Sequence, residues 1–348
     1  MISTSLYTQG WPYMSAEHED LLTPISIAEQ NPNESNEEAS LTSTFRELLG
    51  SDSATMDCQL AAKCVTMLIQ RLDPALDLSR LLRWVVAEDI YEGAEQLAAE
   101  LGREIRLTKT ENSTSGGRIV ETAEGSILLL PASTFRYLID GPEGMAQFTI
   151  NLLHHELCHV HDEAVRKSMP GWHDQMTGRP LTNRMFGPMI WLWDEYSANR
   201  RSTKTIQPDV ERYQFELVVK EYPTVRENVA KAIESWRDHG DMGQLFSELT
   251  SSFGHLFKLL GYSLGSAAGR GISLEQFDPV SYQFLRETWL ASLLEEESIE
   301  QLNTLYETFG SWSGIEVFDE FAETCRLVFW DVGIQIHADH DRLRAKIP

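Results

Sequence analysis

Residues 145–164, MAQFTINLLHHELCHVHDEA, contain the pattern HExxH, formed by His155, Glu156 and His159. The stretch has no Pro or Gly, and a Gly-Pro pair precedes it as a helix breaker. Residues four apart share one face of an α-helix, so both imidazoles can reach one metal ion while Glu156 stands beside them. The sequence therefore predicts a helix that carries part of a metal site.

A helical projection separates this pair from its polar neighbours. An apolar stripe predicts burial of one side of the helix, and His155 and His159 fall on the adjacent sector. His154, Cys158 and His161 fall on the far side. We expect His154 and His161 to be solvated or locally hydrogen-bonded, and Cys158 not to be a ligand.

A catalytic zinc ion needs a third protein ligand and one position open for water. Metzincins place a third His six residues after the second, with a Gly midway. Here Asp162 and Val165 occupy those two positions, which excludes that class.

The third ligand is predicted on a second helix, residues 191–201, WLWDEYSANRR. Projected at 100° per residue, Glu195 lies on the apolar side, opposite the arginines that end this stretch. Asp194 falls about 100° from Glu195. We predict Glu195 as the third ligand and keep Asp194 as the alternative.

The pair of motifs, HELCH and the downstream DEYSAN, resembles the gluzincin arrangement, and within it the ImmA/IrrE-type intracellular metallopeptidase domains. The resemblance covers roughly residues 55–205 and implies a short sheet and two site helices. Thermolysin-like gluzincins carry an Asp that supports a ligand His where this chain has Asn199. Asn199 could take that supporting role or be a polar residue at the core edge.

The surrounding segment predicts an α+β, mainly helical fold: a zincin-like domain with a small sheet, over residues 46–205. Residues 58–72 and 78–101 have the apolar period of helices. Two β-prone runs, 118–122 and 126–130, predict a hairpin before the site helix. We expect the second run to be the sheet edge that pairs with an extended peptide.

Residues 168–188, between the two motifs, contain three Gly and three Pro. This composition predicts a long loop, which would be either a lid over the site or a plain surface loop. A tetrahedral intermediate needs a hydrogen-bond donor opposite the metal. His173, Tyr196 and Arg200 are the candidates for that donor.

The first 45 residues contain no Lys or Arg and include a Ser/Asn/Glu-rich run, which predicts a disordered segment. No signal-peptide pattern and no membrane-length apolar run is present. The four cysteines are scattered without CxxC pairs. We therefore expect a cytoplasmic protein that does not bind membranes, and the oligomeric state stays open.

The formal net charge is −24. Phosphate contacts require a basic face, so nucleic-acid binding is not expected. The charge could steer a basic partner or substrate, or simply keep the surface solvated.

Residues 206–348 are predicted to form an all-α C-terminal domain, with helices at 210–236, 242–260, 281–296, 299–310 and 315–332. The Gly-rich stretch 261–271 predicts the clearest break among them. We assign no chemistry to this region.

These patterns predict a zinc metallopeptidase that cleaves specific intracellular proteins, with Zn²⁺ held by His155, His159 and Glu195 and with Glu156 as the general base. One alternative is a non-enzymatic helical interaction protein with an acidic binding surface and a structural or degenerate zinc site. A closed site of that kind would need a fourth ligand such as His173. A zinc amidase acting on a non-peptide bond is the second alternative.

Overall fold

The computed structural model describes residues 58–105, 107, 109–110, 113–114, 117–169, 172, 180–339 and 342–347. The segment 1–45 and His173 lie outside the described residues. The chain divides into two compact units, Met1–Val160 and His161–Pro348. The division falls inside one continuous helix, α5 (Glu143–Ser168).

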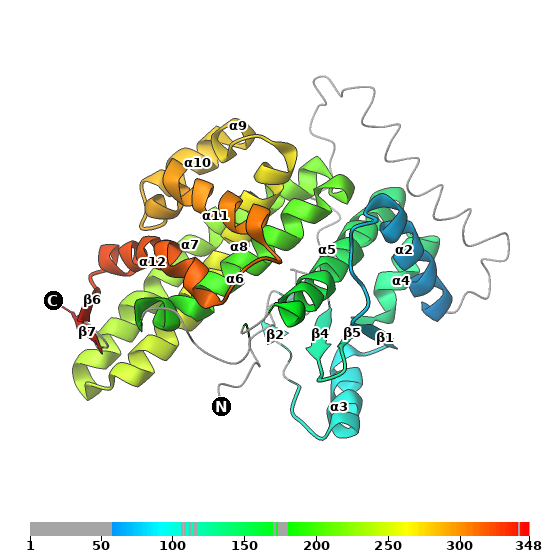
Figure 1. Ribbon diagram of the computed structural model, residues 1–348, viewed down its shortest axis with the longest axis horizontal. Helices are drawn as coiled ribbons and strands as arrows, with labels where there is room; N and C mark the ends of the chain where they lie inside the picture. Colours follow the sequence, from blue (N-terminus) through cyan, green and yellow to red (C-terminus); the bar gives the residue numbers. More distant parts are fainter. Residues whose placement is uncertain are drawn as a thin grey trace. The chain divides into compact units, whose positions relative to one another are not determined.

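The first unit is built on a three-stranded sheet in the order β1-β5-β4 (Figure 1). Strand β1 pairs parallel to β5, and β4 pairs antiparallel to β5. A small hairpin, β2–β3, precedes β4. The elements before α5 are α2 (Cys58–Leu72), β1 (Leu81–Ala87), α3 (Ile90–Leu101), β2 (Lys109–Thr110), β3 (Ser113–Thr114), β4 (Arg118–Glu121), β5 (Ser126–Pro131) and α4 (Ala132–Asp140).

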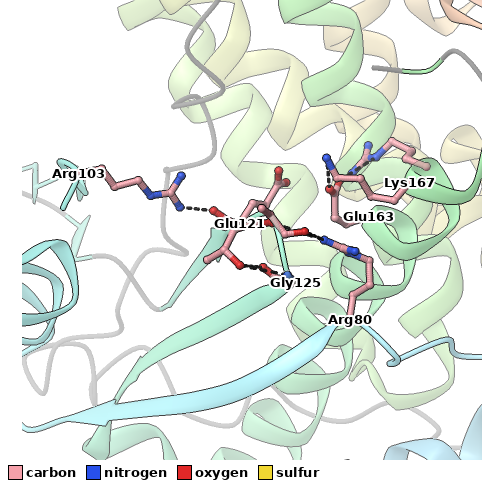
Figure 2. A network of polar contacts seen from close by, with 9 residues as sticks. Arg80, Arg103, Glu121, Gly125, Glu163 and Lys167 are labelled. Carbon is pink, nitrogen blue, oxygen red and sulfur yellow. Dashed lines mark hydrogen bonds and ion pairs between the residues drawn. The ribbon is translucent and has the colours of Figure 1, made fainter. Parts of the chain in front are cut away.

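Local sequence explains this arrangement. Strand β5, SILLLP, has five consecutive buried residues, as expected of a central strand covered on both faces. The turn before it is held by Arg80, whose guanidinium donates to the carbonyl oxygen of Ala123 at 3.0 Å (Figure 2). Asp89 caps α3 by accepting from the amide of Tyr91 at 2.7 Å. The predicted helix at 58–72 and the predicted hairpin are both confirmed.

Two predictions for the first unit are wrong. The stretch 78–101 is not one helix, because residues 81–87 form β1 and the helix begins only at Ile90. An apolar run of this length suits a buried strand as well as a helix, and the parallel partner β5 lies far along the chain. The second run of the hairpin is not the edge either: it forms the central strand β5, and β1 and β4 are the two edge strands among the described residues.

The second unit is mainly helical (Figure 1). Three long helices form its centre: α6 (Pro180–Ser202), α7 (Pro208–His239) and α8 (Met242–Arg270). Shorter elements complete it: η3 (Thr203–Thr205), α9 (Leu274–Phe277), α10 (Pro279–Arg286), η4 (Ala291–Leu294), α11 (Glu296–Thr308), η5 (Ile315–Phe318), α12 (Asp319–Asp331), β6 (Gln335–Asp339) and β7 (Arg342–Lys346).

The predicted break at 261–271 is wrong, because α8 continues to Arg270. Its glycines instead form a seam against α6. A Cβ atom on Gly261 would lie 2.5 Å from the carbonyl oxygen of Leu192, and one on Gly269 would lie 2.6 Å from that of Arg200. Gly265 faces the carbonyl of Tyr196 in the same way. These glycines let the two helix backbones approach closely, which is a packing role and not a turn signal.

Two further expectations change. Residues 180–188 of the predicted loop belong to α6, and Pro188 lies inside that helix. The C-terminal region is not all-α, because β6 and β7 form an antiparallel hairpin.

Within the described residues, no helix combines the length and the apolar character needed to cross a bilayer. The fold is thus mainly helical with a small sheet.

Candidate metal centre

The two motif histidines lie one turn apart on α5, as the helical period predicts. Their Nε2 atoms are 3.0 Å apart, and the ring planes are perpendicular with centroids separated by 4.6 Å. Two imidazole nitrogens on one tetrahedral zinc ion, with bonds of about 2.0–2.1 Å, would be roughly 3.3 Å apart. The pair therefore has the spacing needed for a shared metal ion.

Glu195 on α6 completes the group. Ligand atoms of His155, His159 and Glu195 all lie within 4.8 Å of one another. His155 and Glu195 are buried, and His159 is half-buried. Two imidazoles and one carboxylate are a donor set that suits zinc, with room for water in a fourth position. These three side chains could hold a metal ion.

Asp194, the alternative ligand, has a different partner. Its carboxylate accepts a hydrogen bond from the guanidinium of Arg166 on α5, and both side chains are almost fully buried. Arg166 also lies 3.8 Å from Glu163, which pairs with Lys167 at 3.4 Å (Figure 2). Removing one partner of a buried ion pair is strongly destabilising. This network therefore gives Asp194 a structural role in the second unit.

Lys258 on α8 is a neighbour that the sequence did not reveal. Its Nζ atom lies 3.7 Å from Oε1 of Glu195, and its side chain is 8% exposed. Lysine is almost never fully buried unless it is paired. The signal in the sequence was a lysine inside an otherwise apolar helical run, FKLL, but only the fold shows which carboxylate it faces.

Glu156 is half-buried and has a charged neighbour on the edge strand of the sheet. This neighbour is Arg118, the first residue of β4, which is 8% exposed. Burial lowers the pKa of Arg118 to about 10, and the charges of Glu121 and Glu156 only partly offset that effect. The sequence signal for Arg118 is weak, because it is only an arginine at the start of a short β-prone run.

Asn199 lies among residues of α7 and α8. Its amide nitrogen donates to the side chain of Gln214 at 3.1 Å and to the carbonyl oxygen of Tyr262 at 3.0 Å. It also lies 3.3 Å from the hydroxyl of Ser266. These contacts bind Asn199 to α7 and α8 in the interior of the second unit, and its supporting role for a ligand His stays a prediction.

Two candidates for stabilising an oxyanion are engaged with α11. The hydroxyl of Tyr196 donates to Oδ1 of Asn303 at 2.9 Å, and Arg200 donates to both of these groups at 2.7 Å. Burial raises the pKa of Tyr196 to about 12. Both side chains therefore help to hold α6 against α11, and these contacts give no support to an oxyanion role.

The three residues assigned to the far side of α5 are buried rather than solvated. His154 and Cys158 have no exposed surface, and His161 is 8% exposed. Arg201 donates to Nε2 of His161 at 2.9 Å. The partner of His161 is therefore on α6 and not local, and the solvated alternative is wrong for both histidines because they are buried.

Comparison of the chain with protein-family models, with curated proteins and with solved structures gave no match.

Proposed function

We propose that this protein is a zinc-dependent peptidase. The observation that carries the proposal is the meeting of His155 and His159 from α5 with Glu195 from α6, while Glu156 follows the first of these histidines. Two histidines spaced four apart, an adjacent Glu and a distant carboxylate ligand are the donor set of zinc hydrolases. Zinc held there would make bound water acidic and polarise a carbonyl group.

In this proposal Glu156 moves the protons. Its carboxylate takes one proton from the attacking water, the water oxygen bonds to the carbonyl carbon, and the C–N bond breaks. The proton held by Glu156 then passes to the departing nitrogen, which leaves as an amine. The products are a carboxylic acid and an amine, as peptide-bond hydrolysis requires.

In this proposal the substrate backbone adds to the edge of the sheet. Strand β4 is an edge strand among the described residues, and it lies in the same unit as Glu156. An extended peptide can add to such an edge through main-chain hydrogen bonds. A zincin-like domain with β4 as the substrate-binding edge is therefore part of the proposal, and so is a specific protein substrate.

The test is a comparison of wild type with Glu156→Gln. Elemental analysis should give one equivalent of bound zinc for both proteins. Only wild type should cleave proteins of a cell extract, and mass spectrometry detects this cleavage as new chain ends. Glu95→Gln, an exposed carboxylate on α3, is the matched control and should keep full cleavage. Unchanged cleavage in Glu156→Gln would contradict the proposal.

A second variant separates this proposal from a structural zinc site. Among the described residues, three ligand side chains gather, and a catalytic zinc ion with three protein ligands takes water in its fourth position. A closed site would need a fourth ligand, and the sequence candidate was His173. We expect His173→Ala to keep its zinc; loss of zinc from that variant would favour the structural alternative.

A further inference from the structure

We propose that Arg118 forms a subsite that binds a carboxylate group of the substrate beside Glu156. The inference rests on the proposed peptidase function and adds a substrate preference to it. It is carried by the burial of the Arg118 side chain and by its unsatisfied donors.

The guanidinium of Arg118 is short of hydrogen-bond acceptors. Among the residues that the structure describes, none accepts a hydrogen bond from its Nε or Nη1 atom, and both atoms are buried. A buried charged group that lacks partners is costly for the folded state. A hydrogen-bond acceptor on the substrate could satisfy these donors of Arg118, close to the candidate general base Glu156.

Charges of both signs act on Arg118. Arg103 is close enough to Arg118 to lower its pKa further, so two guanidinium groups lie near each other. Arg103 donates to the carbonyl oxygen of Glu121 (Figure 2). Glu121 and Glu156 act in the opposite direction, but the pKa of Arg118 remains lowered overall. Burial, the largest cause of the lowered pKa, outweighs the two carboxylates, and a carboxylate brought by the substrate would stabilise the charged guanidinium further.

The position of Arg118 suits a peptide substrate. Arg118 is paired with Leu129 of β5 on one side, and no strand of the described part of the chain pairs with the other side of β4. Side chains directly opposite one another on paired strands are about 5 Å apart. A carboxylate on a peptide added to β4 could therefore reach the guanidinium, and arginine matches carboxylate geometry well. The carboxylate could belong to an Asp or Glu side chain or to a free C-terminus.

The test uses the full chain, loaded with zinc, and a random decapeptide library with acetylated N-termini. One half of the library has amidated C-termini and the other half has free carboxylates. We expect wild type to prefer Asp and Glu over Asn and Gln at one position by about tenfold. If the C-terminal carboxylate is the ligand, the preference appears instead as faster cleavage of the free-carboxylate half.

Three variants test whether Arg118 causes this preference for a carboxylate. Arg118→Gln should abolish it, Arg118→Lys should keep part of it, and Arg83→Gln, an exposed arginine on β1, should leave it unchanged. Circular dichroism and thermal unfolding show which variants are folded, and Arg118→Lys retains the charge if Arg118→Gln does not fold. The inference is overturned if wild type shows no preference for a carboxylate, or if the preference persists in folded Arg118→Gln.

A peptide-binding assay tests the Arg118 subsite even if the protein does not cleave peptides. Immobilised Glu156→Gln protein, with and without Arg118→Gln, is incubated with the same library, and the retained peptides are sequenced. Enrichment of carboxylate-bearing peptides that depends on Arg118, in the absence of any cleavage by wild type, would uphold the subsite and reject the peptidase. No such enrichment in binding would reject the subsite, whether or not wild type cleaves peptides.

Discussion

Lys258 lies 3.7 Å from Glu195, measured from Nζ to Oε1, and both side chains are buried. The two residues come from α8 and α6, whose close packing depends on the glycine seam of α8. In the metal-free protein, the ammonium group compensates the charge of a carboxylate that is shielded from water. A metal ion at the candidate centre would compete with Lys258 for that role.

We expect Lys258→Met to destabilise the metal-free protein by about 3 kcal/mol, because Glu195 would remain buried without an opposite charge. Added zinc should stabilise this variant more than it stabilises wild type, since the cation replaces the lost charge. Urea unfolding with a chelator and with excess zinc measures both effects. Lys220→Met, which removes an exposed ion pair with Glu216, is the control. Equal stabilisation by zinc in the variant and in wild type would contradict this expectation.

The two neighbouring carboxylates of α6 should differ in their effects. Glu195→Ala is expected to lose zinc, since it removes one of three ligand groups. Asp194→Ala is expected to keep zinc but to lower the free energy of unfolding by about 3–5 kcal/mol, because Arg166 would be left buried without its partner. Equilibrium dialysis with zinc and urea unfolding separate the two results. Loss of zinc from Asp194→Ala alone would show that the ligand is misassigned.

The sequence predicted the helical stretches that carry the site residues because the helical period is a local property, but it predicted residues 180–188 of α6 as a loop. The spacing of His155 and His159, and the phase of Glu195 relative to Asp194, follow from 100° per residue alone. That these three side chains could share one metal ion is not a local property, and the helical period alone does not predict it.

Features that depend on distant partners were missed. Residues 81–87 pair with β5, which is far away in sequence, and no periodic signal in LLRWVVA distinguishes that strand from a helix. Arg118 interacts with the charge of Glu156, and Lys258 lies close to Glu195. In both pairs the two residues lie on different helices or strands. Tertiary contacts of this kind leave no pattern in a single sequence.

The glycines of α8 can be tested directly. Gly261→Ala should destabilise the protein by about 2–3 kcal/mol, because its Cβ would lie 2.5 Å from the carbonyl oxygen of Leu192 and the two backbones would have to separate. Gly144→Ala on α5 is the matched control, since no described residue lies within 4 Å of a Cβ built there, and helix propensity should make it neutral or stabilising. Thermal unfolding compares them. A Gly261→Ala protein as stable as wild type would contradict the close packing of α8 against α6 at this glycine.

Stability should also depend on pH through one buried carboxyl group of the second unit. Glu211 on α7 is fully buried, and its Oε2 atom lies 2.6 Å from Nε of Arg270 at the end of α8. Burial raises the pKa of Glu211 from 4.5 to about 7, and the hydrogen bond and charge of Arg270 only partly offset this. Between these two values the folded state binds more protons at this residue than the unfolded state.

The free energy of unfolding contributed by Glu211 must therefore fall as the pH rises from about 4.5 to about 7. Glu211→Gln does not titrate, so its stability relative to wild type should increase by up to roughly 3 kcal/mol between pH 4.5 and pH 8. Urea unfolding of both proteins at several pH values measures the difference, and the subtraction cancels the groups that titrate in both proteins. A difference that stays constant with pH would show that Glu211 is ionised throughout, with Arg270 compensating its burial.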